Sequence, residues 1–199
     1  MKIAVLANDE QWNELNDGTN MNECVRIYSQ KEYAAEADGF LVLDDSAFDF
    51  FLTEKPVIKN AVDATLKGMK APINVVRING WSGFLKRSKW EVAGAINNAV
   101  QQIFSSLGKQ PAIVVDEVGF VTARIISMII NEAYFALGEN ISTKEEIDIA
   151  MKLGTNYPYG PFEWAAMIGT EKVYSLLLKL SAQEGRYIPA PLLKEEATL

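Results

Sequence analysis

The chain changes character at residues 119–137, which read GFVTARIISMIINEAYFAL. Apolar side chains fall on nearly every face of a helix through this stretch, interrupted by Arg124, Asn131 and Glu132. A helix of this kind must be covered on most of its sides. Because polar residues divide the apolar run, we expect a buried helix rather than a membrane span. Gly138 follows directly and predicts the end of the helix.

The residues that follow keep to helical periods as well. Ser142 and Thr143 are each followed three residues later by a glutamate, and this pattern predicts a helix that begins with a capping box. Further helices are predicted from Phe162 and from Thr170. The tail, residues 189–199, carries two prolines and is predicted to be partly extended. This half of the chain is therefore predicted to be all-helical.

The first half alternates between two kinds of segment. Short apolar runs typical of buried strands are Lys2–Ala7, Cys24–Tyr28, Gly39–Leu43, Ile73–Ile78 and Ala112–Val115. Segments with helical spacing lie between them, at Gln30–Ala37, Val57–Met69 and Gly94–Leu107. This alternation predicts an α/β layer with a mainly parallel sheet. We therefore expect an α/β domain over residues 1–110 and a helical domain over residues 111–199.

The composition is that of a folded chain with a core. Of the 199 residues 49% are hydrophobic, which suffices for one ordinary domain or two small ones. The formal net charge of −7 argues against nucleic acid or an anionic membrane as the main partner. The apolar start, residues 1–7, runs straight into Asn8-Asp9-Glu10, unlike a signal peptide. We expect a soluble, cytoplasmic protein.

Two residue counts restrict the chemistry further. The chain has no histidine, which excludes a Ser-His-Asp triad, a His–Glu acid–base pair and a His-ligated zinc ion within it. Its one cysteine, Cys24, cannot form an intrachain disulfide. Since no histidine could activate this thiol, we interpret Cys24 as a small buried hydrophobe rather than a nucleophile. No metal site is predicted.

Several short motifs follow one another in the second half. They are Asp116-Glu117-Val118-Gly119-Phe120, Asn131-Glu132-Ala133, Glu146-Ile147-Asp148, Gly160-Pro161-Phe162-Glu163 and Arg186-Tyr187-Ile188-Pro189. Over roughly residues 110–199, their order and spacing resemble the C-terminal domain of the 3-hydroxyacyl-CoA dehydrogenases, oxidoreductases of fatty-acid metabolism. The resemblance implies a helical domain that dimerises and closes one side of an acyl-CoA cleft. A second copy would also cover the apolar helix, although burial wholly within the monomer is the alternative.

The first half resembles the nucleotide-binding domain of the same family faintly, at Lys2–Leu6, Ala37–Leu43 and Lys89–Gly94. The resemblance implies a shortened Rossmann-like domain. Where the family has a G-x-G-x-x-G turn for NAD, residues 8–13 read NDEQWN, with two carboxylates and no glycine. A doubly wound sheet of six strands also needs roughly 150 residues, and only about 110 are present. We therefore expect no cofactor, although the family uses NAD.

The catalytic residues of the family are a histidine and a glutamate twelve positions later. Anchored on Glu91, the resemblance places Asn79 at the histidine position, or Arg77 if a gap is allowed. Neither is a general base near neutral pH. The family's asparagine and a further acid are replaced by Ala123 and Ala166. Glu91 is then a remnant of the catalytic pair.

A basic run beside the implied cleft is the candidate substrate site. Lys86 and Arg87 lie between Trp81 and Trp90. We expect the cations to contact the phosphates of an acyl-CoA, with an indole stacked on the adenine. The alternative is a solvated loop.

These departures predict a dehydrogenase-like pseudoenzyme that is impaired in NAD binding and hydride transfer. It would act as an acyl-CoA-binding or dimerising relative, a homodimer through the helical domain. The alternative is an active 3-hydroxyacyl-CoA dehydrogenase that uses Glu91 as a non-histidine base, or that borrows a partner's nucleotide domain. A third possibility is a structural partner of a full-length dehydrogenase.

Overall fold

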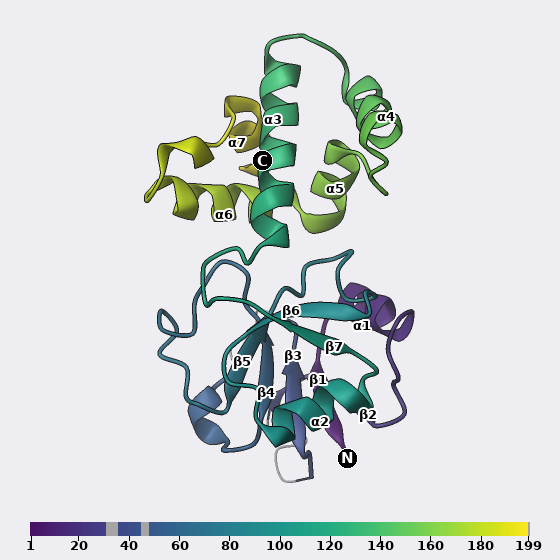
Figure 1. Ribbon diagram of the computed structural model, residues 1–199, viewed down its shortest axis with the longest axis vertical. Helices are drawn as coiled ribbons and strands as arrows, with labels where there is room; N and C mark the ends of the chain where they lie inside the picture. The colour runs from purple at the N-terminus through teal and green to yellow at the C-terminus, as the bar shows by residue number, and fades with distance from the viewer. Residues whose placement is uncertain (31–35, 45–47, 199) are drawn as a thin grey trace. The chain divides into compact units, whose positions relative to one another are not determined.

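The computed structural model describes residues 1–30, 36–44 and 48–198 (Figure 1). It divides into two compact units, Met1–Phe120 and Val121–Leu199. The boundary lies later than the predicted one at residue 110. The reason is that strand β7 (Gln110–Ile113) pairs in parallel with β6 (Lys89–Ala93) and so completes the sheet of the first unit.

The first unit is built on a seven-stranded sheet of order β2-β1-β3-β4-β5-β6-β7. Its other strands are β1 (Ile3–Leu6), β2 (Cys24–Ile27), β3 (Gly39–Val42), β4 (Val57–Asn60) and β5 (Val75–Ile78). Every neighbouring pair is parallel except β5–β6, which is antiparallel. The predicted fold class, a shortened Rossmann-like α/β domain followed by an all-helical one, is confirmed.

The shortening affects the connections and not the sheet. Among the described residues of this unit, the α-helices are α1 (Asp9–Asn16) and α2 (Asn98–Ser106), with a 3₁₀ turn at Phe50–Leu52. The helix predicted over Val57–Met69 is wrong: its first four residues form β4, and turns follow. The length argument was wrong for the same reason, because it assumed a helix in every crossover. The helix predicted over Gln30–Ala37 falls largely on residues 31–35, outside the described residues.

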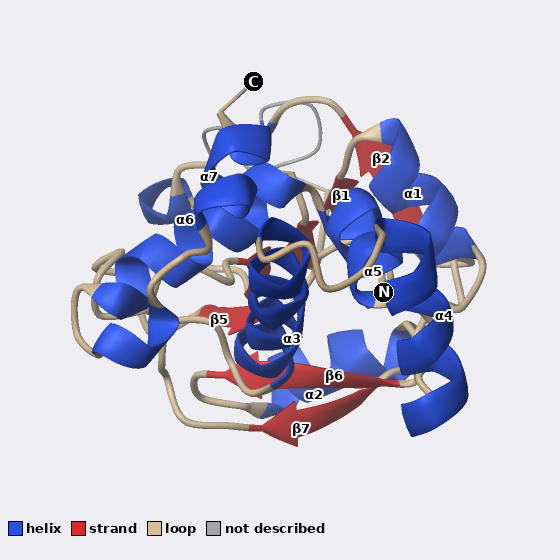
Figure 2. Cartoon of the chain, turned by 90° about the horizontal axis from the view of Figure 1, so that it is seen from above, coloured by secondary structure: helices blue, strands red, loops and turns tan. Residues whose placement is uncertain are grey.

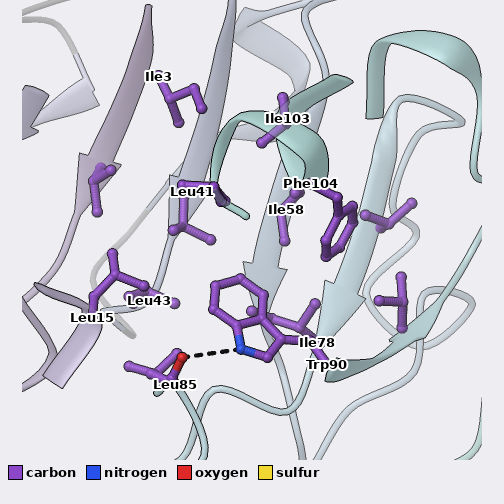
Figure 3. Packing of buried hydrophobic residues seen from close by; sticks show 14 of the residues in the cluster. Ile3, Leu15, Leu41, Leu43, Ile58, Ile78, Leu85, Trp90, Ile103 and Phe104 are labelled. Atoms are coloured by element: carbon purple, nitrogen blue, oxygen red, sulfur yellow. Dashed lines mark hydrogen bonds between the residues drawn. The ribbon is translucent and has the colours of Figure 1, made fainter. Parts of the chain in front are cut away.

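Both faces of the central strands β1 and β3 are buried, which explains why these strands are continuous apolar runs. Side chains alternate along β1: Ile3 and Val5 face one cluster, while Ala4 and Leu6 face the other. The first cluster contains Leu15 of α1 together with Ile103 and Phe104 of α2 (Figure 3). The two helices α1 and α2 therefore cover one face of the sheet.

The second unit is all-helical. Its elements are α3 (Thr122–Gly138), α4 (Lys144–Thr155), α5 (Pro161–Ile168), α6 (Thr170–Ser181), a 3₁₀ turn (Gly185–Tyr187) and α7 (Pro191–Ala197). The long helix α3 lies between α4–α5 on one side and α6–α7 on the other (Figures 1 and 2). None of the helices in the described ranges has the length and apolarity that a bilayer crossing requires.

The tail is partly extended, as predicted, since Ala190 has extended backbone angles, but most of it forms the helix α7. Pro191 occupies its first turn, where the missing N–H would have no partner in any case. Leu193 is fully buried and secures α7 to the unit. At the start of α4, the predicted capping box is confirmed for Thr143, whose hydroxyl accepts from the N–H of Glu146.

Candidate functional site

Ligands of open α/β sheets bind beyond the carboxyl ends of the strands, at the point where the strand order reverses. In this sheet the reversal lies between β1 and β3. Buried amide side chains gather there. Gln11 Nε2 donates to the Leu43 carbonyl at 2.9 Å, and Asn60 Nδ2 donates to the same oxygen at 3.1 Å. These two side chains tie the ends of β1, β3 and β4 together.

Neither Gln11 nor Asn60 was among the residues predicted for the site. A signal for Asn60 was present, because Lys59-Asn60 directly follows the strand-forming pair Val57-Ile58. Buried polar residues at the end of such a strand indicate the ligand-binding edge of a sheet. Gln11 carries no comparable signal, since its partner Leu43 is distant in the sequence.

The two predicted catalytic residues lie at the end of the antiparallel β5–β6 ladder. Ile78, the last residue of β5, pairs with Val92, and the next residues along the chain are Asn79, just outside β5, and Glu91, within β6. Asn79 is buried and its Oδ1 accepts from the Trp81 N–H at 3.3 Å. The adjacent Gly80 N–H donates to Asn60 Oδ1 at 3.0 Å, which links the segment after β5 to the amide cluster.

Arg77, the alternative at the histidine position, has a structural role. Its guanidinium is fully buried and donates to Asp116 Oδ1 at 2.5 Å, to the Ala61 carbonyl at 3.0 Å and to the Glu117 carbonyl at 2.6 Å. It also lies 4.0 Å from the centre of the Phe120 ring. Arg77 therefore fastens the last residues of the first unit to the sheet, and the alternative that gave it the histidine's place is not supported.

The loop between β5 and β6 carries the predicted substrate residues. Lys86 and Arg87 are exposed, as predicted for groups that meet a ligand. The Trp90 indole is instead 2% exposed, lies in the core and donates to the Leu85 carbonyl at 3.1 Å (Figure 3). Trp81 is 6% exposed. The expectation of an indole stacked on adenine is therefore corrected, since neither ring offers a face to a ligand.

The turn after β1 is closed by its own side chains. Asn8 Oδ1 accepts from the Gln11 N–H at 2.9 Å, and Gln11 Oε1 accepts from the Asn8 N–H at 3.1 Å. Arg26 of β2 donates to Asp9 at 2.6 Å and to the Ala7 carbonyl at 3.1 Å. A pyrophosphate would find the Asn8 and Gln11 N–H groups already engaged and the Asp9 carboxylate beside them. These residues do not fit a dinucleotide in the manner of a glycine-rich turn.

The second unit carries an apolar groove of about 440 Å³ between α3, α4 and α5. Its lining consists of Met128, Ile129, Glu132, Ala133, Ala136, Ile147, Met151 and Pro161. The same face of α3 continues to Ile125, which is 55% exposed. Glu132 is the charged member of an otherwise apolar surface.

Cys24 lies half-buried in β2, and burial raises the pKa of its thiol to about 11. We expect iodoacetamide at pH 8 to alkylate Cys24 about a hundredfold more slowly than an exposed cysteine, because the reactive thiolate is correspondingly scarce. Mass spectrometry of timed samples measures the rate, and the protein in denaturant is the control. Labelling as fast in the folded as in the unfolded protein would contradict this assignment.

The arrangement of strands and helices defines the fold class. The whole chain resembles the crystal structure of (S)-3-hydroxybutyryl-CoA dehydrogenase from Ralstonia eutropha, with a TM-score of 0.72, 98% of this chain and 92% of that chain covered, and 19% identity. At that identity the likeness shows the fold alone, a Rossmann-like domain followed by a helical one.

The sequence of the second unit matches a protein family. Residues 119–198 match the model of the 3-hydroxyacyl-CoA dehydrogenase C-terminal domain. The 3-hydroxyadipyl-CoA dehydrogenase of Escherichia coli is 42% identical over 94 residues, 46% of this chain and 20% of that protein. The 3-hydroxybutyryl-CoA dehydrogenase of Bradyrhizobium diazoefficiens is 39% identical over 97 residues, 48% and 33% of the two chains. The helical unit is therefore a C-terminal domain of the 3-hydroxyacyl-CoA dehydrogenase family, and the match spans a third or less of these relatives.

One expectation is overturned by these relatives. The prediction that no cofactor is expected is wrong, because members of the family are NAD-dependent dehydrogenases. The turn after β1, which its own side chains close, is a difference between this chain and a glycine-rich turn. NAD remains the cofactor of the family.

Proposed function

We propose that this member of the 3-hydroxyacyl-CoA dehydrogenase family binds a CoA thioester, with Lys86 and Arg87 contacting its phosphate groups. The observation that carries the proposal is the exposed basic run in the loop between β5, which ends just before Asn79, and β6, which contains Glu91. Arginine and lysine bind phosphate through charge-assisted hydrogen bonds. The relatives named above are dehydrogenases of CoA thioesters, which supports the same ligand class.

The test is a calorimetric titration of acetoacetyl-CoA into the protein, with and without NADH. Binding that is unaffected by NADH and lost in the Lys86→Ala, Arg87→Ala variant supports a thioester-binding protein. Binding that tightens with NADH supports the dehydrogenase alternative described below. Absence of heat under both conditions would overturn the proposal.

We propose further that two copies associate through the groove face of α3. An exposed apolar surface continuous with a groove is typical of an interface. A symmetric dimer would bury this surface against its own copy. The dimer would also account for the apolar residues of α3 that its own unit leaves exposed.

The Ile125→Glu substitution tests the dimer. We expect it to shift the protein from dimer to monomer in sedimentation velocity at micromolar concentration, because a carboxylate would be buried without a partner. Ile149→Glu is the matched control, since Ile149 is 54% exposed on α4 and does not line the groove. A dimer that persists in the first variant, or a wild type that is monomeric, would refute the assignment.

A second candidate function, dehydrogenation, is favoured by the β5–β6 register, since Asn79 and Glu91 are the residues that follow the Ile78–Val92 pair. The amide of Asn79 cannot act as a base, but a carboxylate can, and Glu91 is half-buried in β6. In this alternative, Glu91 would take the proton of a 3-hydroxyl group.

If the chain is active, we expect Glu91→Gln to lower kcat for a 3-hydroxyacyl-CoA by at least about a hundredfold, because an amide cannot act as a base. NADH formation at 340 nm is the measurement, and Glu117→Gln, in the same unit, is the control. Equal turnover in wild type and Glu91→Gln would exclude Glu91 as the base.

A further inference from the structure

The loop that carries Lys86 and Arg87 is held from one side by a carboxylate. Glu14, on α1, accepts the Gly83 N–H at 2.9 Å, the Leu85 N–H at 2.9 Å and the Lys86 N–H at 3.4 Å. Three backbone donors of one short loop therefore converge on a single side chain that is distant in the sequence. A carboxylate that accepts several N–H groups makes strong, charge-assisted bonds.

The same loop is held from the other side by a cation. Lys109, which precedes β7, is 3% exposed, and its Nζ donates to the Leu85 carbonyl at 2.9 Å and to the Arg87 carbonyl at 3.0 Å. It also donates to the Gly18 carbonyl, at the end of α1. All three hydrogens of the ammonium are thus used on backbone oxygens. Its Nζ lies 5.1 Å from the centre of the Trp90 ring.

The charge of Lys109 is retained at neutral pH. Burial lowers the pKa of Lys109 to about 8, and the nearby Glu14 carboxylate acts in the opposite direction. A buried ammonium without acceptors would be costly, and here backbone carbonyls replace water. The loop thus lies between the Glu14 carboxylate and the Lys109 ammonium, and backbone groups supply the hydrogen-bond partners of both.

The loop backbone also packs directly against the end of α1. A Cβ atom placed on Gly18 would lie 2.4 Å from the Lys86 carbonyl oxygen and 2.7 Å from its Cα. Only glycine permits this approach. The backbone at Lys86 is therefore fixed by a carboxylate, an ammonium and a steric contact, while the side chains of Lys86 and Arg87 remain exposed.

We propose that Glu14 and Lys109 are positioning residues, which hold the loop backbone so that Lys86 and Arg87 are preorganised to bind the phosphate groups of a CoA thioester. The inference rests on the proposed function, and it adds two residues that touch no ligand themselves. Preorganisation raises affinity because the loop is already ordered before the ligand binds.

The experiment compares Glu14→Gln with Glu10→Gln. Both substitutions remove one negative charge from α1, but the side chain of Glu10 is exposed and belongs to no contact with the loop. Three quantities are measured on the full chain: amide hydrogen exchange of the Gly83, Leu85 and Lys86 N–H groups, the melting temperature, and the Kd for acetoacetyl-CoA. The Kd is measured at two salt concentrations, because contacts between phosphate groups and exposed cations weaken with salt.

We expect Glu14→Gln to raise exchange at these three amides and to weaken acetoacetyl-CoA binding about tenfold, with a shallower salt dependence. The melting temperature should fall by no more than a few degrees. Glu10→Gln should change neither exchange nor affinity. Unchanged affinity in Glu14→Gln, beside a wild type that binds, would overturn the positioning role alone.

A wild type that binds no CoA ester would overturn the proposed function, and with it the ligand named here. In that case the exchange data still report whether Glu14 holds the loop. The two failures are therefore distinguishable in one set of samples.

Discussion

Replacing Arg77 by methionine should lower the free energy of unfolding of the first unit by about 3–5 kcal/mol. The substitution removes a fully buried guanidinium and leaves the Asp116 carboxylate without its cationic partner. The carbonyls of Ala61 and Glu117 lose their donors as well. Methionine fills much of the space but offers no hydrogen, so the buried Ala61 carbonyl carries its full desolvation penalty and the part-buried Asp116 and Glu117 oxygens carry part of theirs.

Denaturant unfolding followed by tryptophan fluorescence measures this loss, and hydrogen exchange in β5 and β7 assigns it to the first unit. Arg87→Met is the matched control, because Arg87 is exposed; a change within about 0.5 kcal/mol is expected there. A loss below about 1 kcal/mol for Arg77→Met would mean that water replaces the guanidinium, and that the described bonds contribute little.

Replacing Gly160 by alanine should destabilise the helical unit by about 2–4 kcal/mol. A Cβ atom at residue 160 would lie 2.3 Å from the carboxyl carbon of Asp148. Asp148 cannot move without loss, because it caps α5 by accepting from the Phe162 N–H at 2.8 Å and from the Glu163 N–H at 3.1 Å. The Asp148 carboxylate therefore fits only because residue 160 has no Cβ atom.

Gly154→Ala is the control for the second prediction. No atom lies within 4 Å of a Cβ placed on Gly154, and the residue is in α4, so alanine there should stabilise by up to about 1 kcal/mol. The Asp148→Ala, Gly160→Ala double variant should be little worse than the worse single one, since both remove the same cap. Additive losses would show that Gly160 acts independently of Asp148.

The sequence could predict elements whose residues are mostly apolar. The helix α3 and the strands β1, β2, β3 and β5 have mainly apolar patterns, and all are found close to their predicted places. Strand β4 was not predicted because the residues after it, Val62, Leu66 and Met69, have the spacing of one face of a helix. A four-residue strand offers too few positions to outweigh that pattern.

The candidate site was predicted in part, and the difference follows from topology. Asn79 and Glu91 follow the last pair of the β5–β6 ladder, Ile78 with Val92, whose register the strands enforce. The amide cluster of Gln11 and Asn60 depends on strand order, which local sequence does not encode. Trp90 was placed at the surface because of its basic neighbours, although alternation along β6 turns Lys89 outward and Trp90 inward.

The antiparallel pairing of β5 with β6 has a consequence for position 79. Backbone hydrogen bonds, not side chains, hold Arg77 across from Ala93 and Ile78 across from Val92. The register of the two strands is therefore independent of the side chain that follows at position 79. Asparagine and histidine codons differ by one base, so a single point mutation would place an imidazole directly after this ladder.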